Sequence, residues 1–140
     1  MITKNYELIE HTADVGIRVN GRDLKELFTN TALAMFDIIA EKPKKTTLKQ
    51  EEIKIKQQAD NLEELFINWL NELLSLSSVK ELIFSAFKIN KLDKTNIEAI
   101  AIGQDFKNYK VNSEIKAATY HRLKLEETKT GWVVEVIFDV

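Results

Sequence analysis

The strongest folding signal in the sequence is a stripe of large apolar side chains between residues 62 and 74. Its members recur every three or four residues, so one face of an α-helix would hold Leu62, Leu65, Phe66, Trp69, Leu70, Leu73 and Leu74. Asn61 and Glu64 have the spacing of a capping box, which predicts that the helix begins there. We interpret the stripe as the core-facing side of an amphipathic helix and not as a cofactor site.

An earlier segment shows the same pattern. Residues 23–30 (DLKELFTN) align with residues 61–68 (NLEELFIN). Asp23 and Glu26 have the capping-box spacing, which predicts that a helix begins there. The helix that this earlier segment predicts should end before Pro43, because the residue preceding a proline avoids the α region. A stretch of alternating polarity comes before each helix, at residues 15–19 and 52–56. The sequence therefore suggests an internal duplication of a β–α unit.

The other regular segments have the pattern of β-strands. Alternating apolar and polar side chains, interrupted by turn residues, predict strands at residues 6–10, 84–89, 97–102, 114–125 and 132–140. We therefore predict an α+β fold of two layers, in which two amphipathic helices pack on an antiparallel-rich β-sheet. The length of 140 residues fits a single domain, residues 1–140.

Composition limits the classes of function. The absence of cysteine excludes disulfides, thiolate metal sites and a cysteine nucleophile. A formal net charge of −2 argues against broad electrostatic binding to nucleic acid. Residues 42–49 carry four lysines, which we interpret as a solvated loop; contact with an acidic partner or with RNA is the alternative. No segment has the length and apolar character of a signal peptide or a membrane span, so we expect a cytoplasmic protein without membrane contact.

The predicted strand 114–125 begins with Glu114–His121 (EIKAATYH), the chemically richest block of the chain. Side chains of a strand alternate between two faces, and we expect the more apolar face to hold Ile115, Ala117, Thr119 and His121. The opposite face should hold Glu114, Lys116, Ala118 and Tyr120. The simplest interpretation of the charged face is a solvated ladder of weak ion pairs.

The last strand, residues 132–140, should form a hairpin with strand 114–125, because only a short turn separates them. If the polar faces of the two strands coincide, Glu135 or Asp139 lies near Lys116 and Glu114. A single β-bulge in either strand would change this alignment.

Two negative groups stand at the end of the chain, because Asp139 is penultimate and Val140 carries the terminal carboxylate. Such a pair either repels or holds a cation, and hard oxygen ligands favour Ca²⁺, Mg²⁺ or Mn²⁺ over zinc. Asp14 is a candidate third ligand if its strand lies beside the last one. The alternative for each aspartate is a helix-cap or turn position.

The two histidines, His11 and His121, give a weaker signal. Acid–base catalysis would need a histidine beside a carboxylate in a pocket, and a histidine-rich metal site would need more than two. His121 falls on the more apolar strand face, so we expect it to be structural. The sequence has no Gly-rich phosphate loop and no pattern that marks an activated nucleophile, and it gives little support for catalysis.

Four blocks of the sequence together resemble the archease family. In chain order they are residues 11–17 (HTADVGI), 68–74 (NWLNELL), 114–121 (EIKAATYH) and 138–140 (FDV). Each block alone is a weak signal. Four blocks in the same order over the whole chain make a specific one.

The resemblance implies a small α+β protein that activates an RtcB-type RNA ligase in tRNA splicing and RNA repair. Such a protein does not join RNA itself; it promotes guanylylation of the ligase, which uses its own GTP and Mn²⁺ and contacts the RNA. The resemblance also implies a metal site, reported as calcium, at Asp14, Asp139 and Val140, and a functional lysine at Lys116. Other functional candidates in the same blocks are Glu114, His121 and His11.

Two other functions stay open. The family has also been suggested to assist tRNA-modifying methyltransferases as a chaperone or modulator, which would need a partner surface but no metal. The less favoured alternative is a divalent-metal-dependent hydrolase that uses Asp14, Asp139 and either His121 or Glu114. A hydrolase would turn over substrate without a partner protein.

Overall fold

The computed structural model describes residues 6–9, 14–41 and 49–140. It contains two long helices, α1 (Leu24–Ile39) and α2 (Leu62–Lys80), and a short 3₁₀ helix, η1 (Phe106–Asn108). The strands are β1 (Tyr6–Ile9), β2 (Val15–Gly21), β3 (Ala40–Glu41), β4 (Glu51–Gln58), β5 (Leu82–Leu92), β6 (Asn96–Asp105), β7 (Lys110–Val111), β8 (Ala117–Thr128) and β9 (Gly131–Asp139). Within the described ranges, no helix combines the length and the apolar character needed to cross a membrane.

Both long helices begin where the sequence predicted. The Asp23 side chain accepts a hydrogen bond from the N–H of Glu26 at 2.8 Å, and the Asn61 side chain accepts one from the N–H of Glu64 at 2.9 Å. These bonds satisfy backbone donors that the first turn of a helix leaves without intrahelical partners. Helix α1 ends at Ile39, ahead of Pro43, as expected.

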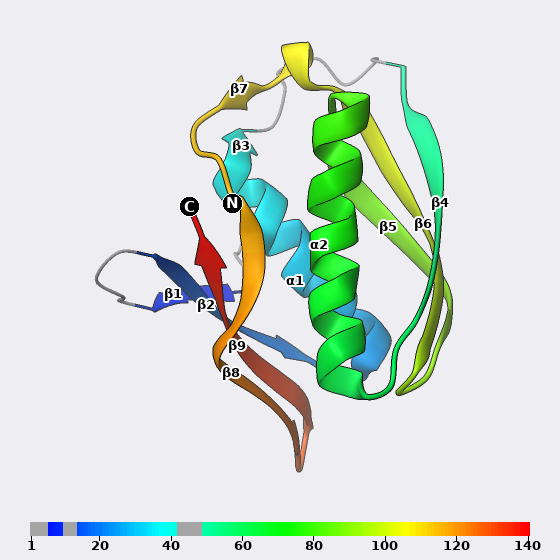
Figure 1. The fold of residues 1–140 in the computed structure, drawn as a ribbon, viewed down its shortest axis with the longest axis vertical. Helices are drawn as coiled ribbons and strands as arrows, with labels where there is room; N and C mark the ends of the chain where they lie inside the picture. The colour runs from blue at the N-terminus through cyan, green and yellow to red at the C-terminus, as the bar shows by residue number, and fades with distance from the viewer. Residues whose placement is uncertain (1–5, 10–13, 42–48) are drawn as a thin grey trace.

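The strands form antiparallel sheets on two sides of the helices. A four-stranded sheet has the order β1-β2-β9-β8, a three-stranded sheet has the order β4-β6-β5, and β3 pairs with β7. Helix α1 contacts β2 and β9 of the four-stranded sheet and β5 of the three-stranded sheet, while α2 contacts β8 on one side and β4, β5 and β6 on the other (Figure 1). The α+β class with antiparallel sheets is confirmed. The division of the strands between two sheets follows from long-range pairing, which the local pattern did not indicate.

In the core, the two β–α units contact each other through residues that occupy equivalent positions in the repeated sequence segment. Phe28 of α1 and Phe66 of α2 occupy equivalent places in the repeated segment, and their rings meet edge to face with centroids 5.2 Å apart. The indole N–H of Trp69 donates to the carbonyl of Phe28 at 3.1 Å. All three side chains are fully buried. Contact between equivalent residues agrees with the duplication that the sequence suggested.

Strand β8 differs from the prediction in its start and in its faces. It begins at Ala117 and not at Glu114, and a β-bulge places residues 120–123 opposite the single residue Val136. Ala118, which we expected on the charged face, is buried against the core beside Phe138. His121, which we expected on the apolar face, lies in the bulge and is exposed. The predicted alternation was therefore wrong between Ala117 and Leu123, because the bulge resets the pleat.

Candidate functional site at the end of the last strand

Three segments that are distant in sequence meet at the end of β9. On one side the β2–β9 register ends with the pair Val15 and Phe138, so that Asp14 and Asp139 are the residues next to the last pair of this ladder. On the other side Ala117 of β8 pairs with Asp139. The N–H of Lys116 donates to the carbonyl of Asp139 at 2.7 Å. We call Asp14, Lys116, Asp139 and Val140 the terminal cluster.

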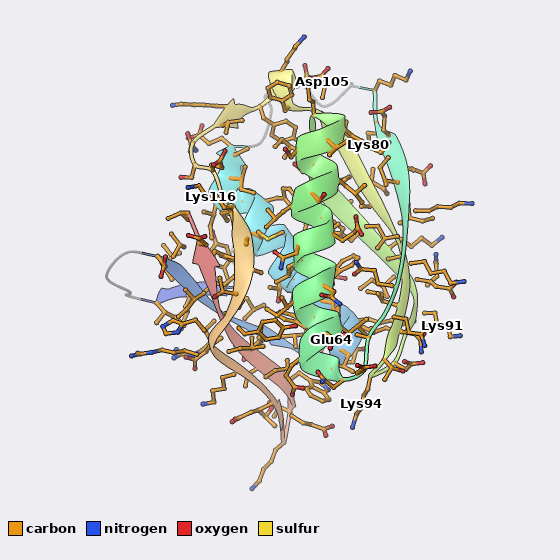
Figure 2. All side chains as sticks on the ribbon, in the orientation of Figure 1. Glu64, Lys80, Lys91, Lys94, Asp105 and Lys116 are labelled. Carbon is orange, nitrogen blue, oxygen red and sulfur yellow. The ribbon has the colours of Figure 1, made fainter. Side chains whose placement is uncertain are left out.

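The charged groups of the terminal cluster lie at the surface, next to residues that are buried in the core. Phe138 is fully buried and Ala118, its partner in β8, is 4% exposed, so both strands are anchored in the core directly beneath the cluster. Lys116 and Asp139 are exposed, Asp14 is half-buried and Val140 is 41% exposed. Figure 2 shows Lys116 beside the end of β9, in agreement with its hydrogen bond to Asp139. A partner molecule can therefore reach both signs of charge at one place.

The donor atoms of the terminal cluster fit a hard cation. Asp14 and Asp139 are next in the chain to the core-facing residues Val15 and Phe138, and strand alternation predicts that their side chains lie on the sheet face that points away from the helices. Val140, the residue after Asp139, completes the ligand set that the sequence predicted. Among the residues that the structure describes, no group of three or more histidine, cysteine, aspartate and glutamate side chains is placed to hold a metal ion. The metal site stays a prediction.

Glu135, the other acid that we considered as a neighbour of Lys116, is held elsewhere. Its carboxylate accepts from the Nε of Arg18 at 3.2 Å, and a second nitrogen of Arg18 donates to Glu7 at 2.9 Å. The hydrogen bond to Glu135, its negative charge and the bond to Glu7 raise the pKa of Arg18. The strand residue beside Glu135 on β8 is Lys124 and not Lys116. Of the two predicted acids, only Asp139 lies near Lys116.

The remaining candidates from the sequence do not join one catalytic arrangement. Glu114 is exposed and precedes β8, His121 lies in the bulge, and His11 falls outside the described residues. The bulge also carries Tyr120, which is 56% exposed, and Arg122 in a left-handed conformation with φ of 52°. Partial burial raises the pKa of Tyr120, and the negative charge of Glu64 adds to this effect.

An open groove of about 760 Å³ runs from the terminal cluster along the C-terminal half of α2. Lys116, Glu114 and Ser113 form one wall, and Asn71 and Ser78 of α2 belong to the other. Sequence reasoning assigned no role to Asn71, although its side chain bonds to the backbone of β8. The one signal that could have found it is its position as a polar residue inside a strongly apolar helix segment.

Comparison with known proteins gives one consistent result. Residues 6–140 match the family model described as "Archease protein family (MTH1598/TM1083)". The chain is 37% identical to Protein archease of Methanosarcina acetivorans, over 98% of this chain and 97% of that protein. It is 35% identical to Protein archease of Pyrococcus abyssi, over 98% of this chain and 99% of that protein.

Two solved structures share the fold. The solution structure of Methanobacterium thermoautotrophicum protein 1598 has a TM-score of 0.74 and 28% identity, covering 99% of this chain and 100% of that one. The crystal structure described as an archease, possible chaperone, from Thermotoga maritima has a TM-score of 0.67 and 25% identity, covering 94% of both chains.

Proposed function

The chain belongs to the archease family, and on this premise we propose that it is a non-catalytic accessory protein that activates an RtcB-type RNA ligase. It promotes guanylylation of the ligase, so that the ligase turns over repeatedly in tRNA splicing and RNA repair. GTP and Mn²⁺ act in the ligase, and the RNA is contacted through the ligase. The Thermotoga maritima relative, described as a possible chaperone, fits the broader class of partner-assisting proteins.

The observation that carries the proposal is the hydrogen bond from the N–H of Lys116 to the carbonyl of Asp139, at 2.7 Å. It fixes the backbone of the exposed Lys116 beside that of the exposed Asp139, at one end of the molecule. Among the described residues the Lys116 ammonium forms no ion pair within the molecule. An exposed lysine without an internal counterion is suited to contact a phosphate or an acidic residue of a partner.

The terminal cluster suggests how activation works. Asp14, Asp139 and the Val140 carboxylate would hold a divalent cation, with Ca²⁺ favoured and Mg²⁺ or Mn²⁺ as alternatives, and the cation would offset most of their negative charge. Phe138 keeps the chain end anchored in the core, and β8 keeps Lys116 beside it. This surface docks at the mouth of the ligase active site, where Lys116 favours the conformation that accepts the nucleotide.

Multiple-turnover ligation with limiting ligase tests the proposal. The ligase alone should stall after about one turnover, and the wild-type protein should restore turnover. Asp139→Ala and Lys116→Ala should reduce the stimulated rate at least about tenfold, the effect of losing one charge-assisted contact. Lys124→Ala is the matched control, because Lys124 is an exposed lysine of β8, the strand that follows Lys116, and pairs with Glu126 at 3.9 Å. A folded Asp139→Ala protein that stimulates the ligase fully contradicts the proposal.

The metal part of the proposal has a separate test. Thermal unfolding is recorded after chelation and then with Ca²⁺, Mg²⁺ or Mn²⁺, because a cation that binds only the folded state raises the melting temperature. We expect the largest rise with Ca²⁺, and its loss in Asp14→Asn and Asp139→Asn. Equal melting temperatures with and without all three cations would remove the cation from the mechanism.

A tRNA methyltransferase chaperone is the second candidate, favoured by the description of the Thermotoga maritima relative. It predicts stabilisation of a methyltransferase without dependence on a cation, together with no effect on ligation. The hydrolase alternative predicts substrate turnover by the isolated protein with a divalent cation. Both outcomes are distinct from stimulation of the ligase.

A further inference from the structure

One side chain of α2 bonds to the backbone of β8 in both directions. The Asn71 carboxamide nitrogen donates to the carbonyl of Ala118 at 3.1 Å, and its oxygen accepts from the N–H of Ala118 at 2.7 Å. The two residues are 47 positions apart in the chain and half-buried to buried. A carboxamide has one acceptor and one donor side, and here both are used on a single residue.

The location of this contact is the outer edge of the four-stranded sheet. Strand β9 pairs with one edge of β8, and within the described residues no strand pairs with the other. The backbone N–H and C=O of Ala118 therefore point away from β9, toward α2. Backbone groups left without partners at a buried position are costly, and an open edge can also pair with foreign strands. Asn71 takes the place that a neighbouring strand would fill.

The part of β8 that Asn71 holds is short. Only three residues, Ala117, Ala118 and Thr119, pair with β9 before the bulge interrupts the register. The Thr119 hydroxyl adds a bond to the Ile137 carbonyl at 2.8 Å. Three residue pairs give little resistance to fraying, because most strand stability comes from longer pairing and packing. An anchor on the outer edge is therefore needed to fix this segment.

We propose that Asn71 is a positioning residue that fixes the start of β8, and through it Lys116 and the end of β9. Ala118 is two residues from Lys116, and the N–H of Lys116 reaches the carbonyl of Asp139. A shift of Ala118 consequently moves the ammonium of Lys116 relative to the carboxylates. This role rests on the proposed function, since it assigns Asn71 to the surface that acts on the ligase.

The first arm of the test measures amide hydrogen exchange of the isolated protein by NMR. Asn71→Leu keeps the side-chain size and removes both hydrogen bonds. We expect exchange at Ala118 and at Lys116 to rise about tenfold, with unchanged exchange in the core of α2. Asn71→Asp keeps an acceptor for the Ala118 N–H but places a carboxylate against the Ala118 carbonyl. In this variant we expect amide exchange to rise at Lys116 and to change less at Ala118.

The matched control is Asn30→Leu. Asn30 lies on α1, and its carboxamide donates to the carbonyl of Asn20 on β2 at 3.0 Å. The variant makes the same chemical change in a helix-to-strand contact far from the terminal cluster. It should leave exchange at Ala118 and Lys116 unaltered.

The second arm measures stimulation of the ligase at increasing concentrations of each variant. A merely structural role for Asn71 would lower the amount of folded protein, and a higher concentration would restore the full plateau. A positioning role lowers the plateau itself, by about the tenfold expected for the loss of Lys116 function, while Asn30→Leu keeps it.

The outcomes separate the two proposals. Full stimulation at saturating Asn71→Leu, or faster exchange at Ala118 without any change at Lys116, overturns the positioning role. A wild-type protein that does not stimulate a competent ligase overturns the proposed function instead. In that case the exchange at Lys116 decides alone whether Asn71 fixes this segment.

Discussion

Helices α1 and α2 each carry an asparagine that bonds to the four-stranded sheet, but the two contacts serve different strands. Asn30 of α1 donates once, to the carbonyl of Asn20, a residue that is exposed and already pairs with β9. Asn71 of α2 donates and accepts, at the buried Ala118, on the edge of β8 that has no further strand in the described part of the chain. The first contact supplements a paired strand, and the second replaces a missing one.

This difference suggests how a duplicated β–α unit can acquire a function. Both helices are capped at their N-termini by a side chain at the equivalent position, Asp23 or Asn61, and both contribute to the same core. Helix α2 additionally closes the edge of β8, the strand that leads from Lys116. We expect the N-terminal caps and the common core to determine stability. We expect the contact of α2 with β8 to determine the geometry of the terminal cluster. The following predictions test that separation.

The largest effect is expected where the two helices meet. Trp69→Ala removes a fully buried side chain and its bond to the Phe28 carbonyl, and should lower the free energy of unfolding by about 3–5 kcal/mol. Denaturant unfolding gives this value. Val79→Ala, on the same helix but 78% exposed, is the control and should change stability by less than about 0.5 kcal/mol. Similar losses in the two variants would mean that the helix interface is not the common core.

The two asparagines should differ in stability as well as in function. Asn71→Ala leaves two buried backbone groups without partners and should cost about 2 kcal/mol. Asn30→Ala exposes the Asn20 carbonyl to water, which can replace the lost donor, and should cost about 1 kcal/mol or less. Denaturant unfolding of both variants in one buffer measures the difference. Equal costs would contradict the claim that Asn71 replaces a strand.

The contrast between these sites also explains what the sequence could predict. The caps at Asp23 and Asn61 and the apolar stripe of α2 depend on residues within one or two turns, and they were predicted correctly. The pairing of β2 with β9, which ends next to Asp14 and Asp139, was only a condition of the predicted metal site, because the sequence did not indicate which strands are neighbours.

The bulge and the role of Asn71 were out of reach for a different reason. Residues 120–123 contain no glycine or proline that would mark an irregular strand, and Arg122 takes its left-handed conformation because of the pairing on both sides of it. Asn71 finds its partner 47 residues later, at a distance that no local pattern encodes. Both features arise from tertiary structure, and the resemblance of sequence blocks indicated a candidate functional region without indicating its geometry.

Removing the cap of either helix should lower the free energy of unfolding by the same amount, in contrast to the unequal losses expected for the two asparagines. Asp23→Ala and Asn61→Ala each remove one acceptor for a first-turn N–H and should each cost about 1 kcal/mol. Thermal or denaturant unfolding of the two variants gives the comparison. Ser substitutions at both positions serve as controls, because serine is also a good cap and should restore most of the loss. Clearly unequal costs would argue that the two units are not equivalent at their starts.

The smallest expected effect is a difference in pH dependence between a contact of α1 and a contact of α2. The Tyr6 hydroxyl of β1 donates to the Asp37 carboxylate of α1 at 2.6 Å, and burial together with this bond raises the pKa of Tyr6. A group with a raised folded-state pKa stabilises the fold fully below its unfolded pKa, near 10 for tyrosine, and loses that contribution as the pH rises further. The carboxamide of Asn71 does not titrate, so its contact with β8 should be independent of pH in this range.

Unfolding free energies between pH 9 and pH 11 test this contrast. The wild-type protein should lose stability faster than Tyr6→Phe as the pH rises, because only the wild type must keep a proton on Tyr6 to hold Asp37. Tyr109 and Tyr120, whose pKa values are also raised by burial, are present in both proteins and cancel in the difference. Asn71→Leu should differ from the wild type by a constant amount over the same range. A difference between Asn71→Leu and the wild type that changes with pH would show that the two helix contacts are coupled and not independent.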